Sequence, residues 1–245
     1  MNKIALCLSG VAGHGSTMRF RSTSSSFGYL AGLESIKKNV IESNGGLDCV
    51  DVFIHSWDPE LQEEMQNAYS AKSILCEYPI YPNFKHDFPQ GIYDENRVQR
   101  TYSRWYSQKH SNILKEEYET KNGFKYDWVI SSRFDIEYIT PINLKELNNN
   151  KFYTSWWEVS SGHMDVYYIS NSDIMNKFNY LYDYLGEYYK PTSELVQRYK
   201  DSTHWSSRSS ELVSNHVISK WHLSSIGHED KQDFFGKEKI NWRIP

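Results

Sequence analysis

The chain has 245 residues, of which 39% are hydrophobic, 16% aromatic and 24% charged, and this composition excludes an intrinsically disordered protein. Its net charge of −4 argues against general nucleic-acid binding, which needs a basic surface. No stretch approaches the ~18 apolar residues of a membrane-spanning helix, so we expect no transmembrane segment.

The three cysteines, Cys7, Cys49 and Cys76, form no C-x-x-C pair, and each lies in or beside an apolar run. This usage is typical of free thiols in a reducing compartment. The apolar run at residues 4–8 is too short for a signal peptide and is better explained as a first strand. We therefore expect a cytoplasmic protein, and the sequence leaves its oligomeric state open.

The first 135 residues alternate between strand and helix patterns. Strands are predicted at residues 4–8, 50–55, 73–76 and in the opening part of 126–138, and helices at 29–41, 59–69 and 95–120. Strands separated by helices predict an α/β fold with a mostly parallel central sheet flanked by helices on both faces.

After residue 135 the pattern changes. Residues 151–159 and 165–170 are predicted strands without long helices between them. An amphipathic helix capped by Ser172 is predicted over 172–188, a further helix near 209–219, and a last strand at 221–226. We interpret the chain as one domain, 1–245, with functional halves at 1–135 and 136–245.

Ligands of open parallel sheets bind outside the carboxyl ends of the strands, so the loops there are the candidate sites. The loop "SGVAGHGSTMRFR" after the first strand includes Ser9 and Gly10, where the backbone can approach a ligand, and Arg19 and Arg21, which can neutralise phosphates. Its glycine spacing matches neither the dinucleotide fingerprint nor the P-loop. His55, at the end of the second strand, is a further candidate contact.

The fourth strand ends in "SSRFD". Residues two apart in an extended chain point the same way, so Arg133 and Asp135 should share one side and Phe134 the other. A carboxylate at a strand end can hold Mg²⁺ or Mn²⁺, and an arginine beside it can pair with phosphate. The alternative is a surface ion pair of little energetic value.

Several short motifs occur in a suggestive order: "KIALCLSG", an early arginine, "DVFIHSW", "YDWVISSRFDIEY", "GHMDVYYIS" and "SSELVSNHV". Together they resemble a glycosyltransferase-like family of bacteria and large DNA viruses with the GT-A fold. The resemblance covers nearly the whole chain and implies a cytoplasmic enzyme of a bacterium or an infected host cell.

The resemblance implies that the first half binds a UDP- or GDP-linked sugar and the second half a glycan or other hydroxyl acceptor. Arg133-Phe134-Asp135 stands where the family carries Asp-x-Asp, so Asp135 would be the remaining carboxylate ligand of Mn²⁺ or Mg²⁺. His228 would complete the metal site. Because an arginine replaces the first aspartate, the need for metal stays open.

An inverting glycosyl transfer needs a base for the acceptor hydroxyl. The resemblance points to Glu211, at the start of a predicted helix, where the alternative role is helix capping. Asp165 is the second candidate, because an acid among Met164, Val166 and Tyr167 is costly to bury unless it is paired or used.

Two other functions stay open. A glycine-bearing loop after the first strand also suits an S-adenosylmethionine-dependent methyltransferase, although no acidic residue is well placed after the second strand to bind the ribose. The aromatic residues of the second half also suit a non-catalytic carbohydrate-binding module; they include Tyr153, Trp156, Trp157, Tyr167, Tyr168 and Trp205.

Overall fold

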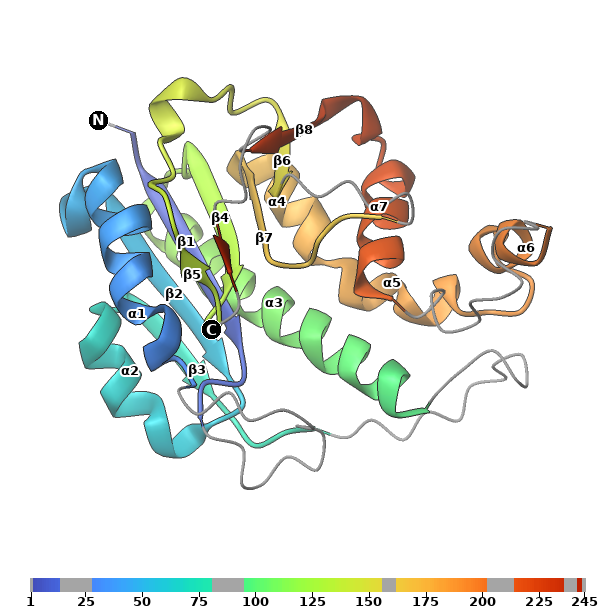
Figure 1. The fold of residues 1–245 in the computed structure, drawn as a ribbon, viewed down its shortest axis with the longest axis horizontal. Helices are drawn as coiled ribbons and strands as arrows, with labels where there is room; N and C mark the ends of the chain where they lie inside the picture. The colour runs from blue at the N-terminus through green and yellow to red at the C-terminus, as the bar shows by residue number, and fades with distance from the viewer. Residues whose placement is uncertain are drawn as a thin grey trace.

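The computed structural model describes residues 2–13, 28–80, 95–155, 162–201, 214–235 and 242–243. Within these ranges a central sheet lies between two layers of helices (Figure 1). Helices α1 and α2 pack on one face, and α3, α4, α5 and α7 pack on the other. This confirms the expected α/β architecture with a mostly parallel sheet flanked by helices.

The central sheet of the described chain has seven strands in the spatial order β3-β2-β1-β4-β7-β6-β8. Its strands are β1 (Ile4–Gly10), β2 (Val50–Ser56), β3 (Ser73–Cys76), β4 (Trp128–Arg133), β6 (Phe152–Ser155), β7 (Tyr167–Ser170) and β8 (Gln232–Phe235). The first four are parallel, β7 is antiparallel to both of its neighbours, and β6 is parallel to β8. A separate ladder pairs β5 (Glu137–Tyr138) with β9 (Trp242–Arg243).

This strand arrangement brings several strand ends together at one edge of the sheet. The parallel strands β1, β2, β3 and β4 all end there, and the antiparallel strand β7 begins there. Ser9 near the end of β1 pairs with Arg133 at the end of β4, and Tyr167 at the start of β7 pairs with Ser132. Residues just before β7 are therefore brought beside the last residues of β4.

The helices are α1 (Leu30–Ile36), α2 (Gln62–Tyr69), α3 (Glu95–Asn122), α4 (Ser172–Asn179), α5 (Leu181–Tyr188), α6 (Glu194–Asp201) and α7 (Asn215–Ser225). Helix α1 continues into a π-helical turn, Lys37–Ile41, and a 3-10 turn, Glu42–Asn44. Gly45, at φ 104°, ends this segment, because glycine adopts that conformation without the steric cost that a Cβ would add.

Each face of the central sheet has its own hydrophobic core, because successive side chains of a strand point to opposite faces of the sheet. In β1, Ile4, Leu6 and Leu8 pack with α1 and α2, whereas Ala5 and Cys7 pack with α3 and the carboxyl-terminal helices. Cys7 is a buried free thiol, and Cys49 and Cys76 are free and partly buried.

The helix predicted over 172–188 is two helices, α4 and α5, that meet at Tyr180. The side chain of Asn171, not Ser172, caps α4 by accepting a hydrogen bond from the amide of Ile174 at 3.0 Å. The Ser172 hydroxyl is instead buried, donating to Glu119 at 2.6 Å and accepting from Lys115 at 2.6 Å. The local pattern could not reveal these partners, because they lie on α3.

The prediction of a strand at 221–226 was also wrong, whereas the helix predicted near 209–219 overlaps α7 from Asn215 on. Helix α7 begins at Asn215, capped by Ser214, and it includes most of the stretch predicted as a strand at 221–226. The short apolar run there fits a buried helix as well as a strand, and burial of Val217, Ile218 and Leu223 selects the helix. The last strand of the central sheet is β8. Among the described residues, no helix has both the length and the apolar character needed to cross a bilayer.

Candidate functional site

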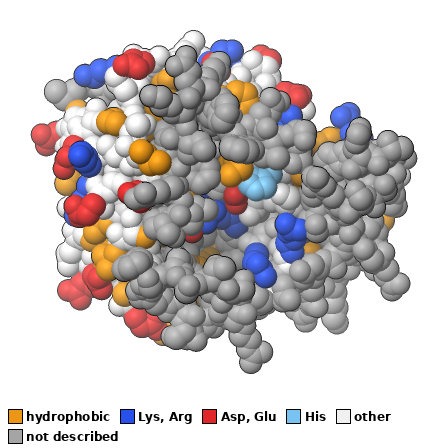
Figure 2. Space-filling view, viewed as in Figure 1, with side chains coloured by type: hydrophobic (Ala, Val, Ile, Leu, Met, Phe, Trp, Pro, Cys, Tyr) orange, Lys and Arg blue, Asp and Glu red, His pale blue; other side chains and the backbone are white. Residues whose placement is uncertain are grey.

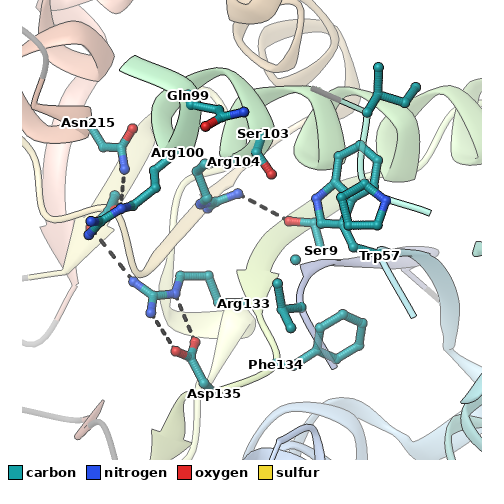
Figure 3. Close-up of a pocket in the computed structure, with 15 residues that line it drawn as sticks. Ser9, Trp57, Gln99, Arg100, Ser103, Arg104, Arg133, Phe134, Asp135 and Asn215 are labelled. Carbon is teal, nitrogen blue, oxygen red and sulfur yellow. Dashed lines mark hydrogen bonds and ion pairs between the residues drawn. The ribbon is translucent and has the colours of Figure 1, made fainter. Parts of the chain in front are cut away.

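A pocket of about 300 Å³ lies at the edge where the parallel strands end. The ends of β1 and β4, the amino-terminal half of α3, the residue Asp165 before β7 and the first residue of α7 all contribute to its lining. Figure 3 shows the arginines of this pocket, Arg100 and Arg104 from α3 and Arg133 from β4, converging from two sides. Two aspartates, Asp135 and Asp165, lie among them.

Arg133 and Asp135 form a bidentate ion pair on one side of the chain. Nε of Arg133 donates to Oδ1 of Asp135 at 2.8 Å, and Nη2 donates to Oδ2 at 2.5 Å (Figure 3). Phe134 between them is buried in the core. The prediction that Arg133 and Asp135 share one side, with Phe134 turned inward, is confirmed. Burial lowers the pKa of Arg133, but Asp135 and Asp165 outweigh it and hold the pKa above its usual range.

Asp165 lies on the other side of Arg133, with 3.9 Å between its Oδ1 and Nη1 of Arg133. The side-chain amide of Asn215 donates to Oδ2 of Asp165 at 3.0 Å, and the Asn215 carbonyl accepts from the Trp105 indole at 3.1 Å. Burial raises the pKa of Asp165, but the positive charges of Arg133 and Arg104 outweigh it and hold the pKa below its usual range. Asp165 is therefore ionised, and its negative charge lies close to the guanidinium groups of Arg133 and Arg104.

Arg104 has a guanidinium group that is only partly hydrogen-bonded. Its Nη1 donates to the Ser9 hydroxyl at 3.1 Å, but the buried atoms Nε and Nη2 have no hydrogen-bond acceptor among the described residues. Burial lowers the pKa of Arg104, and Asp165 acts in the opposite direction. Such a group is suited to an anionic ligand, because an arginine fork matches the oxygen geometry of phosphate and carboxylate.

Ser107 fixes α3 over the strand ends. Its hydroxyl accepts from the backbone amide of Gly10 at 2.8 Å and donates to the backbone carbonyl of His55 at 3.2 Å. One side chain of α3 thus contacts the last residue of β1 and a residue near the end of β2. Arg104, one helical turn earlier, is held beside Ser9 as a result.

Figure 2 shows basic side chains gathered around a hollow in the middle of one face, over the amino-terminal half of α3, with acidic side chains among them. The described residues that line the pocket include three guanidinium groups and two carboxylates, 3 − 2, for a formal charge of +1. A local positive charge on a chain whose net charge is −4 favours a small anionic ligand.

The structure brings together five of the residues predicted from the sequence: Ser9, Gly10, Arg133, Asp135 and Asp165 all line the pocket. Three others, Arg19, Arg21 and Glu211, lie outside the described residues. Helix α7 begins at Asn215, four positions after Glu211 in the sequence.

The two predicted histidines do not line the pocket. His55 is fully buried, with 2.8 Å between its Nδ1 and the Ser107 hydroxyl and 3.0 Å between its Nε2 and Glu77. Burial lowers its pKa to about 4. His228 follows α7 and directly precedes a 3-10 turn, Glu229–Lys231, and burial and the charges of Lys231 and Lys177 lower its pKa. The structure therefore does not bring either ring beside Asp135.

Sequence reasoning missed Arg100 and Arg104, because they belong to the helix preceding the fourth strand and not to a strand-end loop. Their spacing does carry a signal: Arg97, Arg100 and Arg104 recur at intervals of three and four residues, which places them on one helical face. A row of arginines on the face that packs over the strand ends is what an anion site requires.

The residues around Asp135 do not fit a divalent cation. Within the described ranges, no group of three or more His, Cys, Asp or Glu side chains is arranged to hold a metal ion. Hard cations such as Mg²⁺ bind carboxylate oxygens, and both oxygens of Asp135 are bound by Arg133.

Comparison with known proteins gives no assignment: no protein-family model matches the chain, and no curated protein matches it significantly.

Proposed function

We propose that the protein is a glycosyltransferase that moves a sugar from a UDP- or GDP-linked donor to a glycan or other hydroxyl acceptor. The observation that carries the proposal is the convergence of Arg100, Arg104 and Arg133 in one pocket at the carboxyl ends of parallel strands. A nucleoside diphosphate is a multiply charged anion, and ligands of open α/β sheets bind at this edge. The motif order that resembles GT-A glycosyltransferases supports the same function.

In this proposal the arginines stabilise the leaving group. As the anomeric carbon loses its bond to the diphosphate oxygen, the bonding electrons remain on that oxygen, and guanidinium groups aimed at it stabilise the developing charge. For an inverting transfer, the acceptor oxygen bonds to the anomeric carbon from the opposite side and its proton passes to a carboxylate. Glu211 remains the proposed base, because the ionised Asp165 is engaged by Asn215 and two arginines.

The same electrostatics disfavour the methyltransferase alternative. S-adenosylmethionine carries a sulfonium, an ammonium and a carboxylate group and is therefore a net cation, which a pocket whose described lining has three guanidinium groups against two carboxylates disfavours. The carbohydrate-binding module is also less well supported, because Tyr153, Tyr167 and Tyr168 are buried in the cores. The predicted tryptophans Trp156, Trp157 and Trp205 lie outside the described residues.

The test is thermal unfolding with matched ligands. UDP and GDP should raise the melting temperature of the chain more than uridine, guanosine or S-adenosylhomocysteine at equal concentration, because a ligand that binds only the folded state stabilises it. Equal stabilisation by nucleoside and nucleoside diphosphate would contradict the phosphate roles of the arginines. Hydrolysis or transfer of a UDP- or GDP-linked sugar would then identify the donor.

A further inference from the structure

We infer that the arginine pocket binds the donor's diphosphate without a divalent cation, with Arg104 and Arg133 supplying the positive charge that a metal would otherwise supply. The inference rests on the proposed function and specifies how that site holds its ligand. It assigns Asp135 and Asp165 to the positioning of guanidinium groups and not to metal ligation.

The first argument is the state of Asp135. A carboxylate binds a hard cation through an oxygen lone pair with little competition from other cations. Here both oxygens face Arg133, at 2.8 Å from Nε and 2.5 Å from Nη2. A metal at Asp135 would have to displace this fork or lie close to its positive charge, and either arrangement opposes cation binding.

The second argument is the state of Arg104. Its Nε and Nη2 are buried at the pocket without an acceptor in the described part of the chain, although Nη1 is bound to Ser9. Buried charged donors are stable only when they are paired. Oxygens of a diphosphate are the acceptors that match both the charge and the planar geometry of this group.

The third argument is the placement of the two arginines. Arg104 reaches Ser9 at the end of β1, and Arg133 is the residue paired with Ser9 at the end of β4. Arg104 from the helix layer and Arg133 from the sheet thus both neighbour Ser9, and both line the pocket. Asp165 attracts both charges, which helps to hold them together in the absence of ligand.

The primary experiment is calorimetric titration of the full chain with inorganic pyrophosphate, UDP and GDP, in EDTA and in Mn²⁺. We expect dissociation constants in EDTA within about threefold of those in Mn²⁺. Binding that is tenfold or more weaker in EDTA would overturn the inference. Pyrophosphate serves as the probe of the arginine site alone, because it has no nucleoside.

Asp135→Asn should change binding affinity in opposite directions depending on whether Asp135 orients Arg133 or holds a metal. If Asp135 only orients Arg133, its neutralisation removes a competitor for the guanidinium and raises the pocket charge, so pyrophosphate should bind more tightly in EDTA. If Asp135 holds a metal, the substitution weakens binding in Mn²⁺. A loss of affinity in either solution would overturn the inference.

Arg104→Gln should weaken pyrophosphate binding in EDTA at least tenfold, with no rescue by Mn²⁺. Arg198→Gln is the control, because Arg198 is exposed on α6 and does not line the pocket. A melting temperature measured for each variant separates loss of binding from loss of folding. Equal affinity of the two variants would overturn the role of Arg104.

Failure of the inference can be told apart from failure of the proposed function. Nucleotide binding that depends on Mn²⁺ contradicts the inference and leaves the glycosyltransferase intact. Metal-independent binding of pyrophosphate, with UDP and GDP no tighter than pyrophosphate, supports the anion site and contradicts the nucleotide donor. No binding of any of the three ligands contradicts both.

Discussion

Both carboxylate oxygens of Asp135 are bound by the guanidinium of Arg133, which lies two residues earlier at the end of β4. The pair is half-buried and lines a pocket in which Arg104 and Asp165 also lie. A surface ion pair of this kind would be worth little by itself. The pair is relevant to the proposed ligand site because it lines the same pocket as Arg104, whose buried Nε and Nη2 have no acceptor among the described residues.

Arg133→Lys should weaken binding of UDP or GDP on the order of tenfold or more, because a charged hydrogen bond contributes about 1.5–3 kcal/mol and lysine lacks the planar fork. Because lysine keeps the positive charge, a loss of affinity would be due to the missing planar geometry of the guanidinium group. Calorimetry measures the affinity, and Arg198→Lys, at an exposed arginine of α6 outside the pocket lining, is the control. Unchanged affinity in Arg133→Lys would show that Arg133 does not contact the phosphates.

Glu211→Gln should reduce turnover on the order of 10²-fold or more while donor binding and the melting temperature stay near those of the native chain, because the amide cannot accept the acceptor's proton. Glu194→Gln, at an exposed ion pair with Arg198 in α6, is a control for loss of one carboxylate. Normal turnover in Glu211→Gln would place the base elsewhere, and Asp165→Asn would be the next variant to measure.

Gly32→Ala should destabilise the chain by about 1–3 kcal/mol, because the new Cβ would lie 2.3 Å from the Phe134 carbonyl oxygen and 2.6 Å from that of Ile136. The segment that must move directly follows Arg133, so displacement of the arginine's guanidinium should lower nucleotide affinity as well. Gly186→Ala in α5 meets no heavy atom within 4 Å and should instead stabilise by up to about 1 kcal/mol. Denaturant unfolding measures both variants, and equal effects would contradict the close approach of α1.

Stability should decrease as the pH falls from about 6.5 towards 4. Burial lowers the pKa of His55, His163 and His222 to about 4, against about 6.5 in the unfolded chain. Between these values the unfolded state binds more protons than the folded state, so acidification favours unfolding, by up to about 1.4 kcal/mol per pH unit for each histidine. Above about pH 6.5 these groups add no pH dependence.

His222→Gln tests this assignment. The His222 ring lies 2.7 Å from the Tyr188 hydroxyl through Nδ1 and 3.2 Å from the Lys177 carbonyl through Nε2, and an amide offers the same donor and acceptor types. Between pH 6.5 and 4 the free energy of unfolding of the variant should fall less steeply as the pH is lowered. The difference in slope should correspond to about one fewer proton taken up on unfolding. An unaltered slope in equilibrium unfolding would mean that His222 does not titrate as stated.

The sequence by itself determined the elements with strong local patterns. The strand β3 has the predicted bounds, and β1 and β2 lie where alternation of apolar runs with helices placed them. Local pattern also predicted that Arg133 and Asp135 share one side, because residues two apart in an extended chain always do. The longest predicted helix ends two residues after its expected end, before Gly123.

Only the tertiary structure decided which residues surround that pair. Asp165 reaches Arg133 because β7 runs antiparallel to β4 and begins where β4 ends, and strand direction is not encoded in the local pattern. Arg104 reaches Ser9 because Ser107 holds α3 across the strand ends. Ser107 does so by accepting a hydrogen bond from the backbone amide of Gly10, which lies 97 positions earlier in the chain. The break at Tyr180 has the same kind of origin, since the neighbouring Asn179 is tied to Ser131 and to Asn112 on α3. Periodicity reports which face of an element is apolar, whereas long-range contacts decide which charged groups meet at the edge of the sheet.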